Sequence, residues 1–254
     1  MQQNTPAMSI RTPPDPSRGI FETLLVLDGE PVELEAHLRR LANSLAAVYA
    51  AGLPDGAEDL ARGHAADLRH GRLRLTARPA REGVDLGAEA AEIDPGHTFP
   101  TAEAGVTLRS LQLPGGLGAH KWADRSPLGK PEPGVVPLLV DGAEALEAGW
   151  GNLFAVLDGN LVTPPLDGRI LPGVTRALAL AAAGEGGLPI RERRILAAEL
   201  TEADEVLVTN SGRGVESPRS FDTAPLPPPG EVAELLRSAL QARWRRTAGA
   251  FVAS

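Results

Sequence analysis

The chain has 254 residues, of which 43% are hydrophobic and 23% charged, as expected for a globular protein of one large or two small domains. Its net charge of −8 disfavours sequence-independent binding to nucleic acid. The absence of cysteine excludes disulfides, thiol nucleophiles, iron–sulfur clusters and cysteine-ligated zinc.

The first half of the chain alternates strand and helix patterns. Residues 1–18 are polar and proline-rich and predict a flexible lead-in without the apolar core of a signal peptide. Leu34, Leu38, Leu41 and Leu45 recur at helical spacing and predict a buried stripe. The patterns predict a strand at 20–27, helices at 35–50 and 58–69, and strands at 72–77, 88–93 and 105–110.

A glycine-rich stretch, Leu-Pro-Gly-Gly-Leu-Gly at residues 113–118, predicts a linker. We therefore expect a small α/β domain at 19–112, a linker at 113–119 and a larger domain at 120–254. The second half predicts strands at 135–140, 152–157, 188–194 and 205–209, and helices at 172–183, 197–201 and 231–246. Irregular alternation with many hairpin turns favours a mixed α+β fold over a doubly wound parallel sheet.

Several common motifs are missing. No Gly-x-Gly-x-x-Gly follows a predicted strand, Gly129-Lys130 is followed by proline, and Gly-x-Ser-x-Gly does not occur. The five histidines have no metal-ligand spacing, so we expect no metal site. No apolar run approaches the roughly 20 residues of a membrane span. We therefore expect a cytoplasmic enzyme or binding protein.

Lysine usage points to one residue. Only Lys121 and Lys130 are lysines among 25 basic residues, and the rest are arginines. Lysine, unlike arginine, can lose its proton when desolvated and attack a carbonyl. Lys121 is therefore a candidate nucleophile, with an ordinary surface lysine as the alternative, and Lys130 is predicted to be such a surface residue.

Three further motifs accompany Lys121: residues 19–23 (Gly-Ile-Phe-Glu-Thr), residues 147–154 followed by 171–176 (Leu-Pro-Gly-Val-Thr-Arg), and residues 203–211. In order and spacing, these motifs resemble the class IV aminotransferase family, the fold type IV pyridoxal-phosphate enzymes, over about residues 19 to 218. The resemblance implies a two-domain fold, pyridoxal 5'-phosphate in the cleft between the domains, and a homodimer.

The resemblance also implies roles for individual residues. Lys121 would bond covalently to the cofactor and move protons at the substrate carbon. Glu147 would face the pyridine nitrogen and keep it protonated. The cofactor phosphate would be bound by Arg40, in His37-Leu38-Arg39-Arg40-Leu41, by the helix start at Val174 and Thr175, and by Ser211. We expect His37 to be structural.

The family contains branched-chain and D-amino-acid transaminases and the aminodeoxychorismate lyases. Thr23 and the block at 120–125 resemble the lyases, which release pyruvate and form 4-aminobenzoate, and a hydroxyl at Thr23 could relay a proton. A substrate with two carboxylates requires cationic neighbours, for which we name these candidates: Arg74, Arg78, Arg125 and Arg213. A chorismate-aminating enzyme is a possible partner.

Two departures from the family pattern bear on this choice. Transaminases of the family have a tyrosine shortly after the lysine, whereas that place falls near Ser126 here and the only tyrosine is Tyr49. The helix that follows the lysine in relatives is replaced by a proline-rich loop at 127–133. The leading hypothesis is the lyase; the alternatives are an aminotransferase and a non-catalytic cofactor-binding or assembly subunit.

Overall fold

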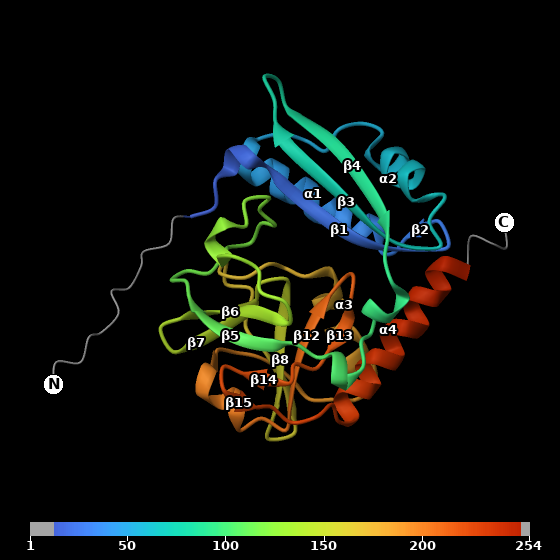
Figure 1. Cartoon of the computed structure of the whole chain (residues 1–254). Helices are drawn as coiled ribbons and strands as arrows, with labels where there is room; N and C mark the ends of the chain where they lie inside the picture. Colours follow the sequence, from blue (N-terminus) through green and yellow to red (C-terminus); the bar gives the residue numbers. More distant parts are fainter. Residues whose placement is uncertain (1–12, 250–254) are drawn as a thin grey trace, which may run out of the picture.

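In the computed structural model, which describes residues 13–249, the chain forms a four-stranded and an eleven-stranded sheet with helices packed against them (Figure 1). Residues 1–12 of the predicted lead-in lie outside the described part. No helix within residues 13–249 is long and apolar enough to cross a membrane. The two mixed layers confirm the predicted α+β fold class.

The smaller sheet has the strand order β2-β1-β3-β4 and carries two helices on one face. Leu24 and Val26 of β1 pack with Leu73 and Leu75 of β3 beneath these helices. The opposite face of β1 is turned toward the larger sheet, so this strand is buried on both sides. The elements are β1 (Ile20–Leu27), β2 (Glu30–Pro31), α1 (Leu34–Tyr49), α2 (Ala57–Ala65), β3 (His70–Pro79) and β4 (Val84–Glu92).

The prediction of β1 is confirmed in full, and α1 begins and ends one residue before the predicted bounds. The predicted helix at 58–69 is too long, because α2 ends at Ala65. Beyond it, the carbonyls of Leu68 and Arg69 accept hydrogen bonds from Gly29 and Asp28 in the β1–β2 turn. The chain has therefore left the helix to join the sheet.

The larger sheet mixes parallel and antiparallel pairs. Its first strands are β5 (Thr107–Gln112), β6 (Val135–Asp141), β7 (Glu144–Ala148), β8 (Gly151–Leu157) and β9 (Asn160–Thr163). The later elements are α3 (Val174–Glu185), β10 (Ile190–Glu192), β11 (Ile195–Leu196), β12 (Glu205–Asn210), β13 (Gly214–Glu216), β14 (Ser220–Phe221), β15 (Ala224–Pro225) and α4 (Glu231–Gly249). The predicted strand at 188–194 is wrong in extent, because β10 pairs with β9 whereas β11 pairs with β7.

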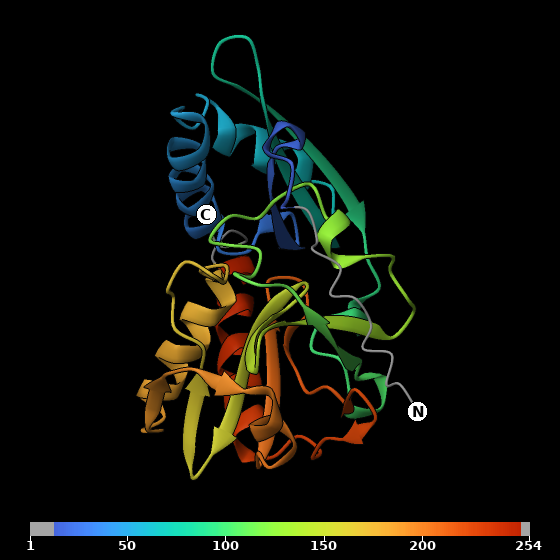
Figure 2. The same cartoon turned by 90° about the vertical axis from the view of Figure 1, so that its left-hand side faces the viewer.

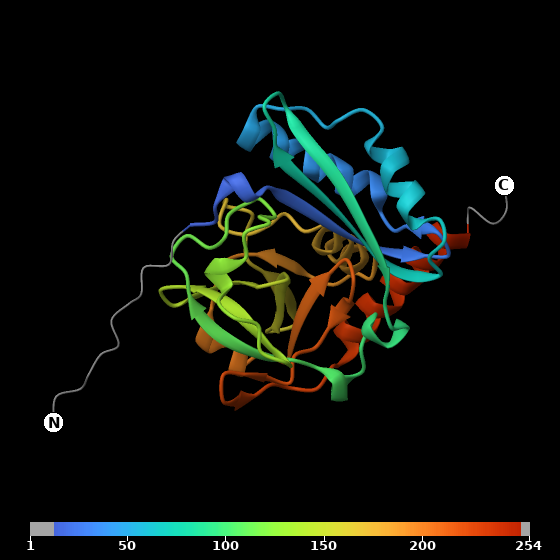
Figure 3. The ribbon, with the colours of Figure 1, turned by 45° about the horizontal axis from the view of Figure 1, so that its top comes forward.

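The chain passes from one sheet to the other before the predicted linker. Strand β5 pairs with β6 and β14 in the larger sheet, although the boundary was predicted after residue 112. By sheet membership the crossing therefore lies between Glu92 and Thr107. The predicted linker, residues 113–119, begins a segment between β5 and β6 that lies between the two sheets (Figure 3).

Helix α4 packs along the larger sheet beside α3 (Figure 2). Its Trp244 is buried in a cluster that also contains Leu25 and Val32 of the smaller sheet region. The carboxylate of Glu205, on β12, accepts hydrogen bonds of 2.9 Å from the N–H groups of Gly230, Val232 and Ala233. One buried side chain thus caps the helix that joins the two sheets.

We expect Glu205→Ala to destabilise the protein by about 1–3 kcal/mol, because it leaves three N–H groups at the start of α4 without their acceptor. The measurement is the free energy of unfolding in denaturant. Glu202→Ala, at an exposed position three residues earlier, is the control and should change it little; equal losses in the two variants would contradict the capping role.

Candidate functional site

Lys121 is fixed by its backbone to the first strand of the smaller sheet. The N–H of Phe21 donates to the carbonyl of Lys121 at 2.9 Å, and the N–H of Ala123 donates to Gly19 at 2.9 Å. The indole N–H of Trp122 donates to the carbonyl of Leu117 at 2.9 Å. These bonds place the lysine amine 4.9 Å from the centre of the Phe21 ring.

A cavity of about 760 Å³ opens beside this amine between the two sheets, within the usual size of a small-molecule site. Strands β1, β3, β8 and β12 and the start of α3 contribute to its wall. The structure brings most of the predicted site residues to it: Thr23, Arg40, Arg74, Lys121, Arg125, Val174, Thr175, Ser211 and Arg213.

The surroundings of Lys121 favour its neutral form. Burial is the largest cause, and the charge of Arg40 adds to it; together they lower the pKa of Lys121 from 10.5 to about 7, although Glu22 and Glu147 oppose the shift. A large part of the amine population is therefore unprotonated near neutral pH. A neutral amine is the form that attacks an aldehyde.

Glu147 lies next to the cavity wall. Its Oε2 accepts a hydrogen bond of 3.1 Å from the N–H of Leu171 and a longer one of 3.4 Å from Nδ2 of Asn152. Leu171 and Asn152 line the cavity, whereas Glu147 stands behind them. Burial raises the pKa of Glu147 to about 8. A cation in the cavity would favour the charged form of this carboxylate.

The start of α3 lies at the cavity, and its first backbone N–H groups have no side-chain cap within residues 13–249. Gly173 precedes the helix without a side-chain cap, so the first N–H groups of α3 have no partner within the helix. The hydroxyls of Thr175 and Ser211 lie 3.2 Å apart at the same place. Helix dipole and hydroxyl donors together suit an anion such as a phosphate.

Arg40 joins this helix start to the smaller sheet. Its Nε and Nη2 donate to the two carboxylate oxygens of Glu22 at 2.8 Å and 2.5 Å, and its Nη1 donates to the carbonyl of Pro172 at 3.1 Å. Nδ1 of His37 lies 2.8 Å from Glu22. Burial alone would raise the pKa of Glu22, but Arg40 and His37 outweigh it and lower that pKa to about 2.

The four candidate arginines differ in their partners. Arg213 pairs with Glu216 at 2.7 Å, and Arg125 donates to the carbonyl of Gly149. Arg74 has no ion pair or hydrogen bond from its guanidinium to any residue in 13–249, and it lies 3.9 Å from the Phe21 ring centre. Arg78 does not line the cavity; it lies in a neighbouring hollow that Arg74 also borders, because four further strand residues carry it about 13 Å beyond Arg74.

Two residues of the site were missed. Glu22 was quoted in the first motif without a role, yet a carboxylate within a run of apolar strand residues is a signal for a buried ion pair. Asn152 was likewise quoted but not selected, although its amide joins Glu147 to the carbonyl of Leu171 at 2.8 Å. Glu22 holds Arg40 and Asn152 holds Glu147, and both of these partners are predicted site residues.

Comparison with known proteins points to one family for the region that contains much of this site. Residues 135–220 match the family model described as amino-transferase class IV. The solved 4-amino-4-deoxychorismate lyase of Pseudomonas aeruginosa has a TM-score of 0.74 and 27% identity over 93% of this chain and 96% of that chain. Over residues 135–220 the chain thus matches the class IV aminotransferase family, and over most of its length it is similar to that solved lyase.

Other members of the family are similar over different extents. The branched-chain-amino-acid aminotransferase of Escherichia coli K12 is 31% identical over 150 residues, which are 58% of this chain and 45% of that protein. The chain thus matches less than half the length of the curated relatives. A putative branched-chain aminotransferase of Thermotoga maritima shares the fold, with a TM-score of 0.77 and 23% identity over 89% of this chain and 86% of that chain.

The cofactor of class IV aminotransferases is pyridoxal phosphate, and the cavity fits its three chemical features. The lysine amine with its lowered pKa suits the aldehyde, the uncapped N–H groups at the start of α3 suit the phosphate, and the buried Glu147 carboxyl suits the pyridine nitrogen. Lys121 would therefore hold the cofactor, and the start of α3 with Ser211 would hold its phosphate.

Uptake of pyridoxal phosphate by Lys121 should depend on pH. Below the pKa of about 7, the amine is protonated and does not attack an aldehyde, so we expect the rate of uptake to rise through pH 7 and then level off. Stopped-flow absorbance measures this rate, and borohydride reduction should fix the cofactor to the wild type but not to Lys121→Ala. A rate that still rises about tenfold per pH unit beyond pH 8, as for an amine of ordinary pKa, would contradict the lowered pKa.

The raised pKa of Glu147 predicts a pH-dependent effect on stability in the unloaded protein. Between the ordinary pKa of 4.5 and about 8, the folded state keeps a proton that the unfolded chain has lost, so stability falls as pH rises through this window. Glu147→Gln lacks this loss and should gain stability relative to wild type from pH 4.5 to 8. Denaturation curves at several pH values test this; parallel changes in both proteins would disprove it.

Proposed function

We propose that this chain is a pyridoxal-phosphate-dependent lyase that converts 4-amino-4-deoxychorismate to 4-aminobenzoate and pyruvate. The observation that carries the proposal is the pairing of Thr23 with Arg74 across β1 and β3, on the wall of the cavity that Lys121 also lines. A hydroxyl, an unpaired guanidinium and a neutral amine are thereby gathered around one space. The similarity to the Pseudomonas lyase supports the same activity.

Each of these groups has a task in the proposed reaction. Arg74 binds a substrate carboxylate through its unpaired N–H groups. Lys121 removes the proton from the carbon that bears the substrate amine, and Thr23 orients the substrate or relays a proton. Pyridoxal phosphate, when bound, supplies a ring that accepts electrons. The carbon–oxygen bond to the pyruvate unit then breaks, its electron pair leaves with that unit as the enolate, which takes up a proton from solvent to become pyruvate, and the remaining ring becomes aromatic.

The second candidate is an aminotransferase that acts on a branched-chain or D-amino acid. The match to the Escherichia coli branched-chain-amino-acid aminotransferase favours it. Against it, no tyrosine lines the cavity in the described part of the chain. Tyr49 lies on α1, where its hydroxyl donates to the carbonyl of Pro16 at 2.6 Å. A homodimer and a chorismate-aminating partner stay predictions, as does a non-catalytic role.

Product analysis separates these functions. The purified protein is incubated with pyridoxal phosphate and a system that generates aminodeoxychorismate, and both 4-aminobenzoate and pyruvate are measured. We expect the two products in equal amounts, and their formation should require Lys121. Conversion of the cofactor to its amine form by an amino acid alone, without these products, would instead support the aminotransferase. A protein that takes up no cofactor would support a non-catalytic role.

Arg74→Ala should raise KM more than it lowers kcat. A hydrogen bond to a charged group contributes roughly 1.5–3 kcal/mol, so KM should rise about tenfold to a hundredfold. Arg78→Ala is the matched control, because Arg78 lies on the same strand outside the cavity. Steady-state kinetics of both variants test the assignment, which is rejected if their KM values change equally.

A further inference from the structure

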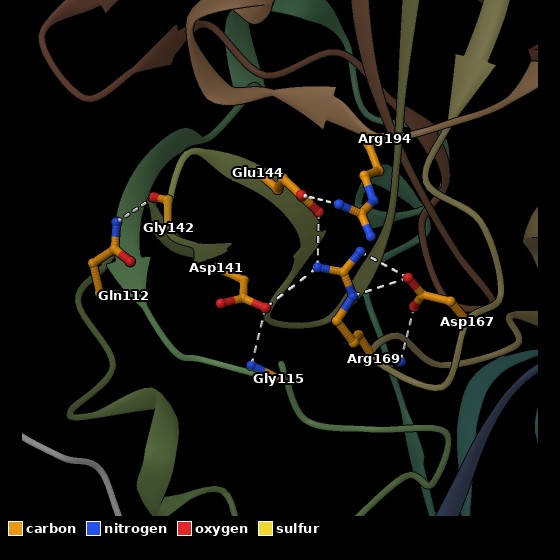
Figure 4. Close-up of polar contacts among 8 residues, drawn as sticks. All are labelled: Gln112, Gly115, Asp141, Gly142, Glu144, Asp167, Arg169 and Arg194. Atoms are coloured by element: carbon orange, nitrogen blue, oxygen red, sulfur yellow. Dashed lines mark hydrogen bonds and ion pairs between the residues drawn. The ribbon is translucent and has the colours of Figure 1, made fainter.

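Arg169 is the centre of a charged cluster outside the cavity (Figure 4). Its Nη1 donates to Glu144 at 2.8 Å and to Asp141 at 3.3 Å, and its Nε and Nη2 donate to Asp167 at 2.9 Å and 2.7 Å. Arg194 donates to the second oxygen of Glu144 at 2.8 Å. A single guanidinium thus ties the loop between β9 and α3 to the β6–β7 turn.

The charges of this cluster support one another. The hydrogen bonds of Arg169 with Asp167 and Glu144 raise the pKa of Arg169 above its ordinary value. Arg169 in turn lowers the pKa of Asp167. The Arg169 side chain is 19% exposed, less than expected for an isolated surface arginine. Charge networks with several partners are worth more than single exposed pairs.

The backbone of the same residue holds the segment that leads to Lys121. The carbonyl of Arg169 accepts a hydrogen bond of 3.2 Å from the N–H of Gly118. Gly116, with a φ of +66°, passes so close that a side chain there would lie 2.1 Å from this carbonyl. Next along the loop, Ile170 is buried with Leu113 and Leu117 of the lysine segment. The two loops are therefore packed together at Arg169.

The three residues after Ile170 each contact or adjoin another part of the site. Leu171 donates to Glu147 through its N–H at 3.1 Å and accepts from Asn152 at 2.8 Å. Pro172 accepts from Arg40 at 3.1 Å, and Gly173 precedes α3. Consecutive residues of one loop thus contact the groups predicted to bind the pyridine nitrogen and the phosphate.

We propose that Arg169 is a positioning residue of the cofactor site. It fixes the position of the lysine segment, residues 113–121, relative to the start of α3. The proposal follows from the contacts of the side chain and of the backbone of Arg169. Its guanidinium anchors the loop to the β6–β7 turn, and its carbonyl and next neighbour hold the lysine segment. Arg169 touches no group in the cavity, so its effect reaches the cofactor through Lys121, Glu147 and Gly173.

The test compares Arg169→Ala and Arg169→Lys with wild type. In the protein without cofactor, we expect faster hydrogen exchange of Arg169→Ala in two separate stretches, residues 112–122 and 166–176. We also expect the dissociation constant for pyridoxal phosphate to rise about tenfold, as for the loss of outer contacts that orient a ligand site. Arg169→Lys keeps the charge but loses the planar guanidinium with its several donors. Both the increase in exchange and the rise in the dissociation constant should therefore be smaller than in Arg169→Ala.

Arg62→Ala is the matched control. Arg62 also binds two carboxylates, those of Glu30 and Glu58, but in the region of α2 and β2. It should lower the melting temperature without changing exchange in the two stretches or the cofactor affinity. The proposal is overturned if Arg169→Ala leaves residues 112–122 as protected as in wild type, or if Arg62→Ala weakens cofactor binding equally.

The variant Glu144→Gln gives the same test if Arg169→Ala does not fold. It keeps the contacts of Arg169 with Asp167 and of Gly115 with Asp141 but weakens the anchor on the β6–β7 turn, and unchanged exchange in both stretches would overturn the proposal. Hydrogen exchange of the unloaded protein decides the role of Arg169 even if wild type binds no pyridoxal phosphate, a result that would reject the proposed function alone.

Discussion

The site depends on a backbone pairing that holds a lysine in a partly buried position between the two sheets. The hydrogen bond from Phe21 to the carbonyl of Lys121 lays the lysine segment along the first strand of the smaller sheet. Its amine is thereby placed between two sheets, where burial lowers its pKa to about 7. The other groups of the site surround this amine with its lowered pKa.

Two buried carboxyl groups near the cavity differ in how far their charges are compensated. Glu22 is held ionised by Arg40, with a pKa of about 2, whereas Glu147 has mainly amide donors and a pKa of about 8. The first carboxylate fixes an arginine, and the second retains the capacity to gain charge when a cation arrives. A ligand that carries both an anionic and a cationic end complements this distribution.

The sequence predicted what depends on local pattern. The leucine spacing of α1 and the apolar run of β1 predicted these elements closely, and the motifs around Lys121, Thr175 and Ser211 predicted residues that meet at one cavity. Contacts between distant segments could not be predicted. The pairing of β5 with β14 moved the crossing between sheets, and only the folded chain distinguishes unpaired Arg74 from Arg213, which Glu216 binds.

The turn between β1 and β2 has a consequence for how this protein can change. Asp28 and Gly29 both have positive φ, 47° and 83°, in a two-residue turn that fixes the register of the hairpin. Glu22 and Thr23 are neighbours on opposite faces of β1, so a shift of β1 by one residue would put a carboxylate at the cavity wall in place of a hydroxyl. An insertion or deletion in this strand would therefore change which residues meet the cavity, whereas replacement of a single side chain would leave the strand pairing intact.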